Sequence, residues 1–360
     1  MRVNKGILSK RLDLGVVFVF FLISAIGLFT LAGIYEGSIF LKRQILWHVI
    51  GIAAFLGVLS FDRKFFREWV WFFYIGAIAL LIMVLIVGKV GKGAQRWIII
   101  GPFRLQPSEF AKIALALALG SVFEHFSVKG RIPLGLREVL IVGAVCLPFF
   151  ILTAMQPDLG TALIFVLVAA TVSFFAGIKR GTLVLCLLFA FVVAFVGWNH
   201  LKPYQKNRII AFLDPKKDPY RTGYHIIQSR IAIGSGRLWG KGYMKGTQSR
   251  LNFIPEKHTD FIFPTFAEDW GFIGVCVLLF LYFVFITRII EICKRAKNPY
   301  ALYTTVALGA IFFWHIVINV GMTMGLLPVV GVPLPLMSYG GSATVASYIT
   351  LGLILVMVRE

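Results

Sequence analysis

The sequence predicts an all-α polytopic membrane protein, with about ten transmembrane helices and one large extracytoplasmic loop between helices 7 and 8. Of its 360 residues, 59% are hydrophobic and only 14% are charged, whereas soluble chains are about half apolar and about a quarter charged. Runs without any charged side chain recur at lengths near the roughly 20 residues that a helix needs to cross a bilayer. The composition therefore excludes an ordinary soluble globule.

Seven helices follow directly from uncharged runs, which cover residues 14–35, 44–61, 69–88, 139–157, 159–178, 181–201 and 270–287. We expect the last of these helices to extend over 262–287. An eighth helix is expected over 107–123, because Pro107-Ser108-Glu109 is typical of a helix start. Glu109 and Lys112 then place two charges in its first turns, where they are costly unless they face a cavity or a partner.

The stretch from Asn298 to Val358 carries no Asp, Glu, Lys or Arg and is too long for one helix. Glycines and prolines break it between residues 325 and 341. We therefore expect two helices, 300–324 and 341–358, joined by a segment that lies at the membrane surface or dips into it. With these ten helices, residues 1–360 are interpreted as a single membrane domain.

The distribution of basic residues predicts the orientation of the chain. The short connections on the side of the two termini carry nearly three times as many Lys and Arg as those on the opposite side. The positive-inside rule then places both termini in the cytoplasm. The first hydrophobic run has no small-residue cleavage site after it, which indicates a retained helix rather than a signal peptide.

The loop over 201–261 is expected on the outer side and carries about three basic residues for each acidic one. Its many glycines and prolines indicate tight turns and backbone that approaches a ligand closely. Long ordered loops on rigid scaffolds are where binding and catalytic sites are usually built. The alternative is a solvated basic loop that contacts anionic lipid headgroups. The net charge of +20 favours partners that carry phosphate, and in this composition membrane lipid rather than nucleic acid.

Asp260 lies where the polar loop meets the apolar start of the next helix. Partial desolvation at such a boundary suits a carboxylate that acts as a general base on a sugar hydroxyl. The alternative is that Asp260 only caps the helix that begins near Phe261. The spacing alone does not separate these two roles.

Other charged residues suggest a polar network and an anion site. Glu109, Lys112 and Asp158 either wall an outward-facing cavity or form an internal salt-bridge network that fixes helix packing. Arg96 and the loop cations can hold an anionic headgroup; these cations are Arg208, Arg221, Lys241, Lys245 and Arg250. Trp97 is either an interfacial aromatic anchor or a stacking surface for a sugar ring. The histidine and cysteine spacing indicates neither a metal site nor a disulfide framework.

Eight motifs resemble those of the SEDS (shape, elongation, division and sporulation) family over essentially the whole chain. They are GAQRW at 93–97, QPSEF at 106–110, QPDLGT at 156–161, FLDP at 212–215, GYHIIQS at 223–229, AIGSG at 232–236, PEKHTDFIF at 255–263 and LPLMSYGGS at 334–342. Taken together in this order they are highly specific. VVGV at 329–332, AEDWGFIG at 267–274 and the short amino terminus are more similar to the RodA branch than to the FtsW division branch.

The resemblance implies a peptidoglycan glycosyltransferase of the bacterial cytoplasmic membrane that serves cell-wall elongation and rod shape. Such an enzyme polymerises lipid II, the undecaprenyl-pyrophosphate-linked disaccharide pentapeptide, into β-1,4-linked glycan on the outer face. Asp260 then corresponds to the essential loop aspartate of the family and serves as the general base of an inverting displacement. Arg208, Lys241, Arg96 and Lys112, or a divalent cation such as magnesium or manganese, would meet the charge on the pyrophosphate. Trp97, Glu256, His258 and Thr259 are further candidates for substrate contact.

The resemblance also implies partners and leaves other function classes to be tested. The expected partners are a class B penicillin-binding transpeptidase and elongation-complex proteins such as MreC and MreD, besides lipid II and the lipid-linked glycan. The alternatives are a flippase or transporter of lipid-linked precursors, a scaffold that recruits a synthase, and the FtsW-type paralogue of the same enzyme.

Overall fold

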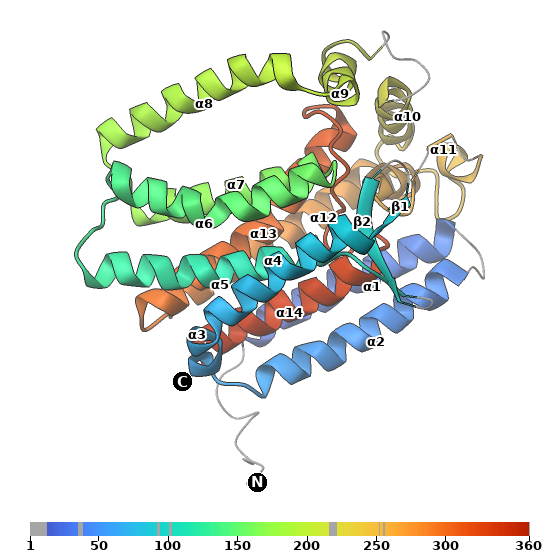
Figure 1. The fold of residues 1–360 in the computed structure, drawn as a ribbon. Helices are drawn as coiled ribbons and strands as arrows, with labels where there is room; N and C mark the ends of the chain where they lie inside the picture. Colours follow the sequence, from blue (N-terminus) through green and yellow to red (C-terminus); the bar gives the residue numbers. More distant parts are fainter. Residues whose placement is uncertain are drawn as a thin grey trace.

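The computed structural model describes residues 13–34, 39–91, 94–100, 103–215, 222–251, 253–254 and 256–359. In these residues, ten helices are long and apolar enough to cross a membrane. They form a bundle from which α8 stands apart (Figure 1). The ten are α1 Leu14–Ile34, α2 Ile39–Leu59, α4 Val70–Val87, α5 Pro107–Val128, α6 Leu136–Met155, α7 Leu159–Ala176, α8 Arg180–His200, α12 Ile262–Lys294, α13 Pro299–Met324 and α14 Gly341–Val358. The predicted all-α polytopic fold is confirmed.

Four shorter helices lie between the spans. They are α3 Arg63–Glu68, α9 Pro203–Leu213, α10 Thr222–Ser235 and α11 Thr247–Arg250. The last three belong to the large loop between α8 and α12, so this loop folds into short helices separated by turns. Figure 1 shows them at the end of the bundle opposite to the C-terminus.

Several spans extend beyond the expected bounds. Helix α2 begins at Ile39 and so includes Lys42 and Arg43, and α12 continues to Lys294. Long cationic side chains reach toward water from the end of a helix without interrupting it. The charged residues therefore mark where the apolar surface of a span ends. The helix itself continues past them, because its backbone hydrogen bonds do not require apolar side chains.

A small antiparallel sheet lies in the connection between α4 and α5. The sequence had not predicted strands there. Its strands are β1 Lys89–Gly91, β2 Ala94–Ile100 and β3 Phe103–Leu105, in the order β1-β2-β3. Ile98 pairs with Leu105 in the ladder between β2 and β3. The sheet lies at the same end of the bundle as α9, α10 and α11 (Figure 1), and β2 carries Arg96 and Trp97 there.

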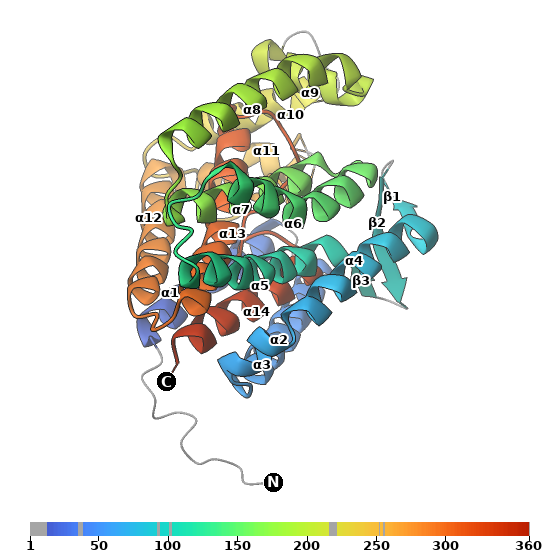
Figure 2. The ribbon, with the colours of Figure 1, turned by 60° about the vertical axis from the view of Figure 1, so that its left-hand side comes forward.

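The two ends of the described chain lie at the opposite end of the bundle. Figure 2 shows the start of α1 close to the C-terminus. Ion pairs and hydrogen bonds close this end, where Asp13 contacts Arg295 at 3.1 Å and Arg359 donates to the carbonyl of Leu59 at 2.6 Å. Helices α5, α13 and α14 form the centre, with 67% to 72% of their apolar windows buried, whereas only 6% of the α8 window is buried.

Helix α12 is broken at Gly271, which has φ 64° and ψ −165°. Backbone N–H and C=O groups of α12 that the break leaves without helical partners form hydrogen bonds with the loop segment 236–242. Four hydrogen bonds join the segment to both sides of the break, from Lys241 N to Glu268 O at 3.0 Å, Gly242 N to Asp269 O at 3.0 Å, Phe272 N to Arg237 O at 2.8 Å and Ile273 N to Leu238 O at 3.1 Å. The loop is thereby fixed to the membrane bundle through the backbone.

We expect Gly271→Ala to destabilise the fold. An added Cβ would overlap the backbone nitrogen of Gly240, and a positive φ costs other residues about 1–3 kcal/mol by itself. Gly76 is the matched control, because it lies in a helix and a Cβ there meets no atom within 4 Å. Thermal unfolding in detergent should show a lower midpoint for Gly271→Ala and an unchanged or higher midpoint for Gly76→Ala. Equal midpoints for the two variants would contradict the interpretation.

Candidate active site

Asp260 ends the turn that leads from the large loop into α12. The N-cap position of α12 is Phe261, so Asp260 lies one residue before the position at which a helix cap acts. Its carboxylate borders the segment 325–340, because a Cβ added to Gly331 would lie 3.3 Å from Asp260 Oδ2. Gly331 also has φ 76°, a conformation that glycine adopts without strain. The backbone of the 325–340 segment therefore passes next to the Asp260 carboxylate.

Arg208 on α9 approaches the same segment. Its Nη1 donates to the carbonyl of Val330 at 3.4 Å, one residue from Gly331. Burial lowers the pKa of Arg208 below its ordinary value and the guanidinium of Arg96 lowers it further, whereas the nearby carboxylates of Asp158 and Asp260 raise it. Two guanidinium groups and two carboxylates therefore interact in one partly desolvated region.

Arg96 and Asp158 form the other half of this region. The Arg96 Nη1 lies 3.6 Å from Asp158 Oδ1, and its other nitrogens donate to the carbonyls of Gln156 and Pro157. Asp158 is the N-cap residue of α7 and accepts from Thr161 N at 3.3 Å and from Thr161 Oγ1 at 3.0 Å. Asp158 thus has two structural tasks, capping α7 and holding Arg96 at the bundle end that carries the loop.

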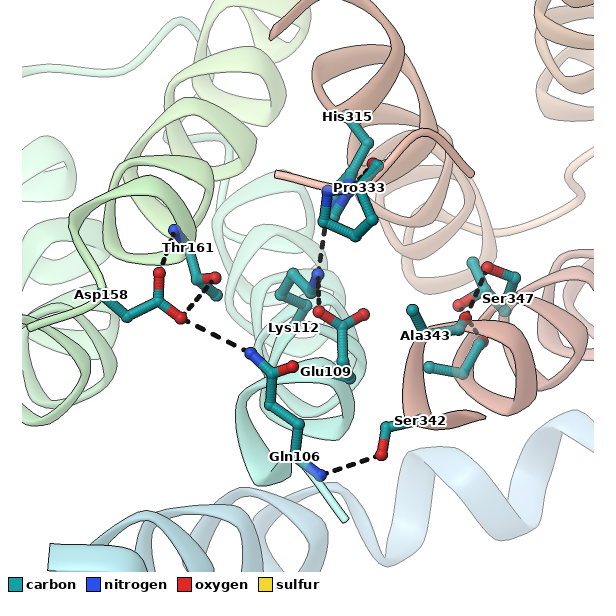
Figure 3. A network of polar contacts seen from close by, with 12 residues as sticks. Gln106, Glu109, Lys112, Asp158, Thr161, His315, Pro333, Ser342, Ala343 and Ser347 are labelled. Carbon is teal, nitrogen blue, oxygen red and sulfur yellow. Dashed lines mark hydrogen bonds and ion pairs between the residues drawn. The ribbon is translucent and has the colours of Figure 1, made fainter. Parts of the chain in front are cut away.

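Glu109 and Lys112 lie deeper, on the first turns of α5. Lys112 Nζ is 2.9 Å from Glu109 Oε1 and 2.7 Å from His315 Nε2, and Figure 3 shows these groups meeting between α5 and α13. Glu109, Lys112 and His315 line one pocket together with Pro333–Leu336 and residues of α14. The pair is therefore an internal ion pair at the lining of a pocket, and the two interpretations of the network stay predictions.

Gln106, the N-cap residue of α5, joins Asp158 to the start of α14. Its Nε2 lies 3.5 Å from Asp158 Oδ2, and its backbone nitrogen donates to Ser342 Oγ at 2.9 Å. Figure 3 shows Gln106 between Asp158 on one side and Ser342 at the start of α14 on the other. Asp158 is therefore linked to the α5 start rather than paired with Lys112.

We expect Lys112→Met to destabilise the protein by about 3–5 kcal/mol, because it leaves the Glu109 carboxylate buried without its cation. Lys112 is 2% exposed and Glu109 is 6% exposed. The double variant Lys112→Met/Glu109→Gln should recover most of the loss, since it removes both charges. Unfolding midpoints of the three proteins in detergent measure this. A double variant as unstable as Lys112→Met alone would contradict the ion-pair account.

The structure places the remaining candidates around the loop. Lys241 Nζ lies 2.7 Å from Glu268 Oε1 and donates to Thr247 at 2.7 Å, so its charge is directed to a fully buried carboxylate. Trp97 is partly exposed on β2, opposite Lys89. Arg221 lies outside the described residues, as does the side chain of Arg250.

The residues that precede Asp260 pack closely with one another and with neighbouring rings. Thr259 Oγ1 donates to Glu256 Oε2 at 3.2 Å. The ring of His258 lies 5.1 Å from that of Phe40 and 5.7 Å from that of Tyr339. The turn 256–260 is thus an ordered structure that supports the carboxylate.

The comparisons with known proteins agree with these motifs and this fold. A family model for FtsW, RodA and SpoVE, described as cell cycle protein, matches residues 7–360. The chain belongs to this family. It is 39% identical over 316 residues to the peptidoglycan glycosyltransferase MrdB of Escherichia coli strain K12, covering 88% of this chain and 84% of that protein. The SEDS resemblance is thereby confirmed.

Two solved structures have the same fold along nearly the whole chain. One comes from work on structural coordination of polymerization and crosslinking by a peptidoglycan synthase complex, with TM-score 0.84, 31% identity and 97% of both chains covered. The other is the rod shape determining protein RodA of Thermus thermophilus, with TM-score 0.73, 27% identity and 97% and 96% of the two chains covered. This family member is therefore a multi-pass membrane protein with a RodA-like bundle.

Sequence reasoning missed several residues that organise the site. Asn319 and His315 lie one turn apart on α13, in a long stretch without charged residues where no sequence motif marks them. Lys257 is buried, and desolvation lowers its pKa below the ordinary value. In the described part of the chain, no group of three or more His, Cys, Asp or Glu side chains is arranged to hold a metal ion.

Proposed function

We propose that this protein polymerises lipid II, with Asp260 as the general base and Arg208 and Arg96 as the cations that face the pyrophosphate. The protein is a peptidoglycan glycosyltransferase of the RodA type, and an elongation role fits this similarity. The assignment of its substrate, its site residues and its partners goes beyond the comparisons and rests on the chemistry of the site.

The Asp260 carboxylate takes the proton from the 4-hydroxyl of the GlcNAc of an incoming lipid II. The oxygen attacks the anomeric carbon of the MurNAc at the lipid-linked end of the growing strand. The bond from that carbon to the pyrophosphate oxygen breaks, and an α-linked donor becomes a β-1,4 linkage. Pyrophosphate leaves as a stable anion, so one base and suitably placed cations suffice, unlike the two carboxyl groups of a glycosidase.

The observation that carries the proposal is that a base and a cation border the same piece of backbone. Arg208 contacts the carbonyl of Val330, and the Asp260 carboxylate lies against Gly331. A sugar hydroxyl at the carboxylate and a pyrophosphate at the guanidinium would then be held side by side. Fixed cations stabilise developing negative charge most strongly where water is partly excluded, and Arg208 is such a partly desolvated cation.

We place this site on the outer face of the cytoplasmic membrane, with both termini in the cytoplasm, on the basis of the positive-inside rule. We also propose a class B penicillin-binding transpeptidase, together with MreC and MreD, as partners. The solved relative from a peptidoglycan synthase complex supports a partner that crosslinks glycan. A divalent cation, magnesium or manganese, is the alternative counter-charge for the pyrophosphate.

The experiment is polymerisation of labelled lipid II by the purified protein, with and without the transpeptidase and with and without magnesium or manganese. Glycan polymer on a gel is the expected result. The same protein in proteoliposomes is tested for transfer of lipid II across the bilayer. Absence of polymer in every condition, together with transfer across the bilayer, would replace the proposal with the flippase.

A further inference from the structure

The turn that bears Asp260 is fixed from outside at three successive backbone carbonyls. Tyr339 N donates to His258 O at 2.8 Å, and Ser338 Oγ donates to Thr259 O at 2.6 Å. The Asn319 side chain completes the series by donating from Nδ2 to Asp260 O at 2.9 Å. All three donors come from α13 and the segment 325–340 that follows it, at least 59 residues away in the chain.

Asn319 also holds the backbone on the other side of the carboxylate. Its Nδ2 donates a second hydrogen bond, to Val332 O at 2.7 Å. Both acceptors are carbonyl oxygens, which cannot donate, so the orientation of the amide follows from its partners. One buried amide therefore joins Asp260 to the residue that follows Gly331, the glycine against the Asp260 carboxylate.

A packing role does not account for an asparagine at this position. Asn319 is fully buried, and its Oδ1 has no hydrogen-bond partner within the described structure. A buried polar group in a membrane span is costly, and a leucine would fill a similar volume without that cost. His315, one turn earlier, lies with Nδ1 3.3 Å from Pro333 O. The same face of α13 thus pins two successive carbonyls of the 325–340 segment.

We propose that Asn319 is a positioning residue for the general base, which acts by fixing the Asp260 backbone relative to the Val330–Val332 backbone that Arg208 contacts. Ser338 supports the same turn through its hydrogen bond to Thr259 O. Neither side chain needs to touch the substrate. The proposal rests on the proposed function, because it assigns Asn319 a role only through Asp260. A displacement of about 1 Å at a reacting group reduces the rate by about 10²-fold.

The test compares Asn319→Leu with the control Thr323→Val. Thr323 is a fully buried residue one turn further along α13, and its hydroxyl bonds only to carbonyls of its own helix. At saturating lipid II, Asn319→Leu should polymerise about 10- to 100-fold more slowly than the wild type, with an affinity for lipid II within about twofold. Thr323→Val should remain within about twofold in both measurements.

A second comparison separates positioning from general destabilisation. In an Asp260→Asn background, Asn319→Leu should have no further effect on the residual rate, because effects that act through one group do not add. Ser338→Ala should slow polymerisation with unchanged lipid II binding, and Ser338→Thr, which keeps the hydroxyl, should restore it. These two variants also test the turn if Asn319→Leu does not fold.

Three outcomes would overturn the proposal. One is wild-type polymerisation by folded Asn319→Leu. Another is a further loss of rate in the Asp260→Asn background. The third is a parallel fall in rate, lipid II affinity and unfolding midpoint, which would indicate a structural role alone. If neither the wild type nor Thr323→Val formed glycan from lipid II, the result would contradict the proposed function itself, and with it this inference.

Discussion

Asp260→Asn is expected to lower the rate of lipid II polymerisation by about 10²- to 10⁴-fold, the contribution that a general base makes to catalysis. The substitution keeps the size of the side chain and removes its ability to accept a proton. The backbone of Asp260 remains fixed, because Asn319 bonds to its carbonyl rather than to its side chain. The measurement is the initial rate of glycan formation by purified protein.

A matched control for the loss of a carboxylate is Glu291→Gln. Glu291 lies near the end of α12, away from the loop, and pairs at 3.2 Å with the exposed Arg288. Exposed ion pairs contribute about 0–1 kcal/mol, so this variant should polymerise at the wild-type rate. An Asp260→Asn enzyme that keeps more than about a tenth of the wild-type rate would be inconsistent with proton removal by Asp260.

Arg208→Gln is expected to lower the same rate by about 10²- to 10³-fold, the usual effect of removing one group that stabilises developing negative charge. The loss should be accompanied by weaker inhibition by undecaprenyl pyrophosphate, because that product carries the group which the guanidinium would bind. Arg208→Lys should recover part of the rate, since lysine keeps the charge but lacks the planar fork of donors.

The control for Arg208 is another cation of the same loop. Arg237 is exposed, and it contacts α12 through its backbone carbonyl, which accepts a hydrogen bond from Phe272 N. Arg237→Gln should therefore change the rate less than about threefold, as expected of an exposed charge screened by salt. Equal losses for Arg208→Gln and Arg237→Gln would show that the loop acts through its total charge and not through a specific contact.

The spans could be predicted because a bilayer imposes one simple requirement on the chain. The uncharged stretch from Asn298 to Val358 predicted helices over 300–324 and 341–358, and the structure has them over Pro299–Met324 and Gly341–Val358. The small sheet was not predicted, although Ile98-Ile99-Ile100 is a run of β-branched residues of the kind that strands favour. Three residues are too few for periodicity to separate a strand from a loop.

The charges of the site could be placed along the chain but not in space. Asp260 stood out because it marks a boundary between polar loop and apolar helix. The ion pair between Lys241 and Glu268 depends on the break in α12 at Gly271. A single glycine in an apolar run does not show in the sequence that the helix breaks there. Asn319 is one uncharged amide in a long apolar stretch, and its two carbonyl partners are set by how α13 packs against 325–340.

The most direct test of the central claim measures lipid II binding and polymerisation by Asp260→Asn side by side with the wild type. If Asp260 removes a proton, the variant should bind lipid II with an affinity within about threefold of the wild type and form almost no glycan. Polymerisation at the wild-type rate would contradict the claim. So would a loss of lipid II binding as large as the loss of rate, because Asp260 would then bind substrate rather than act as a base.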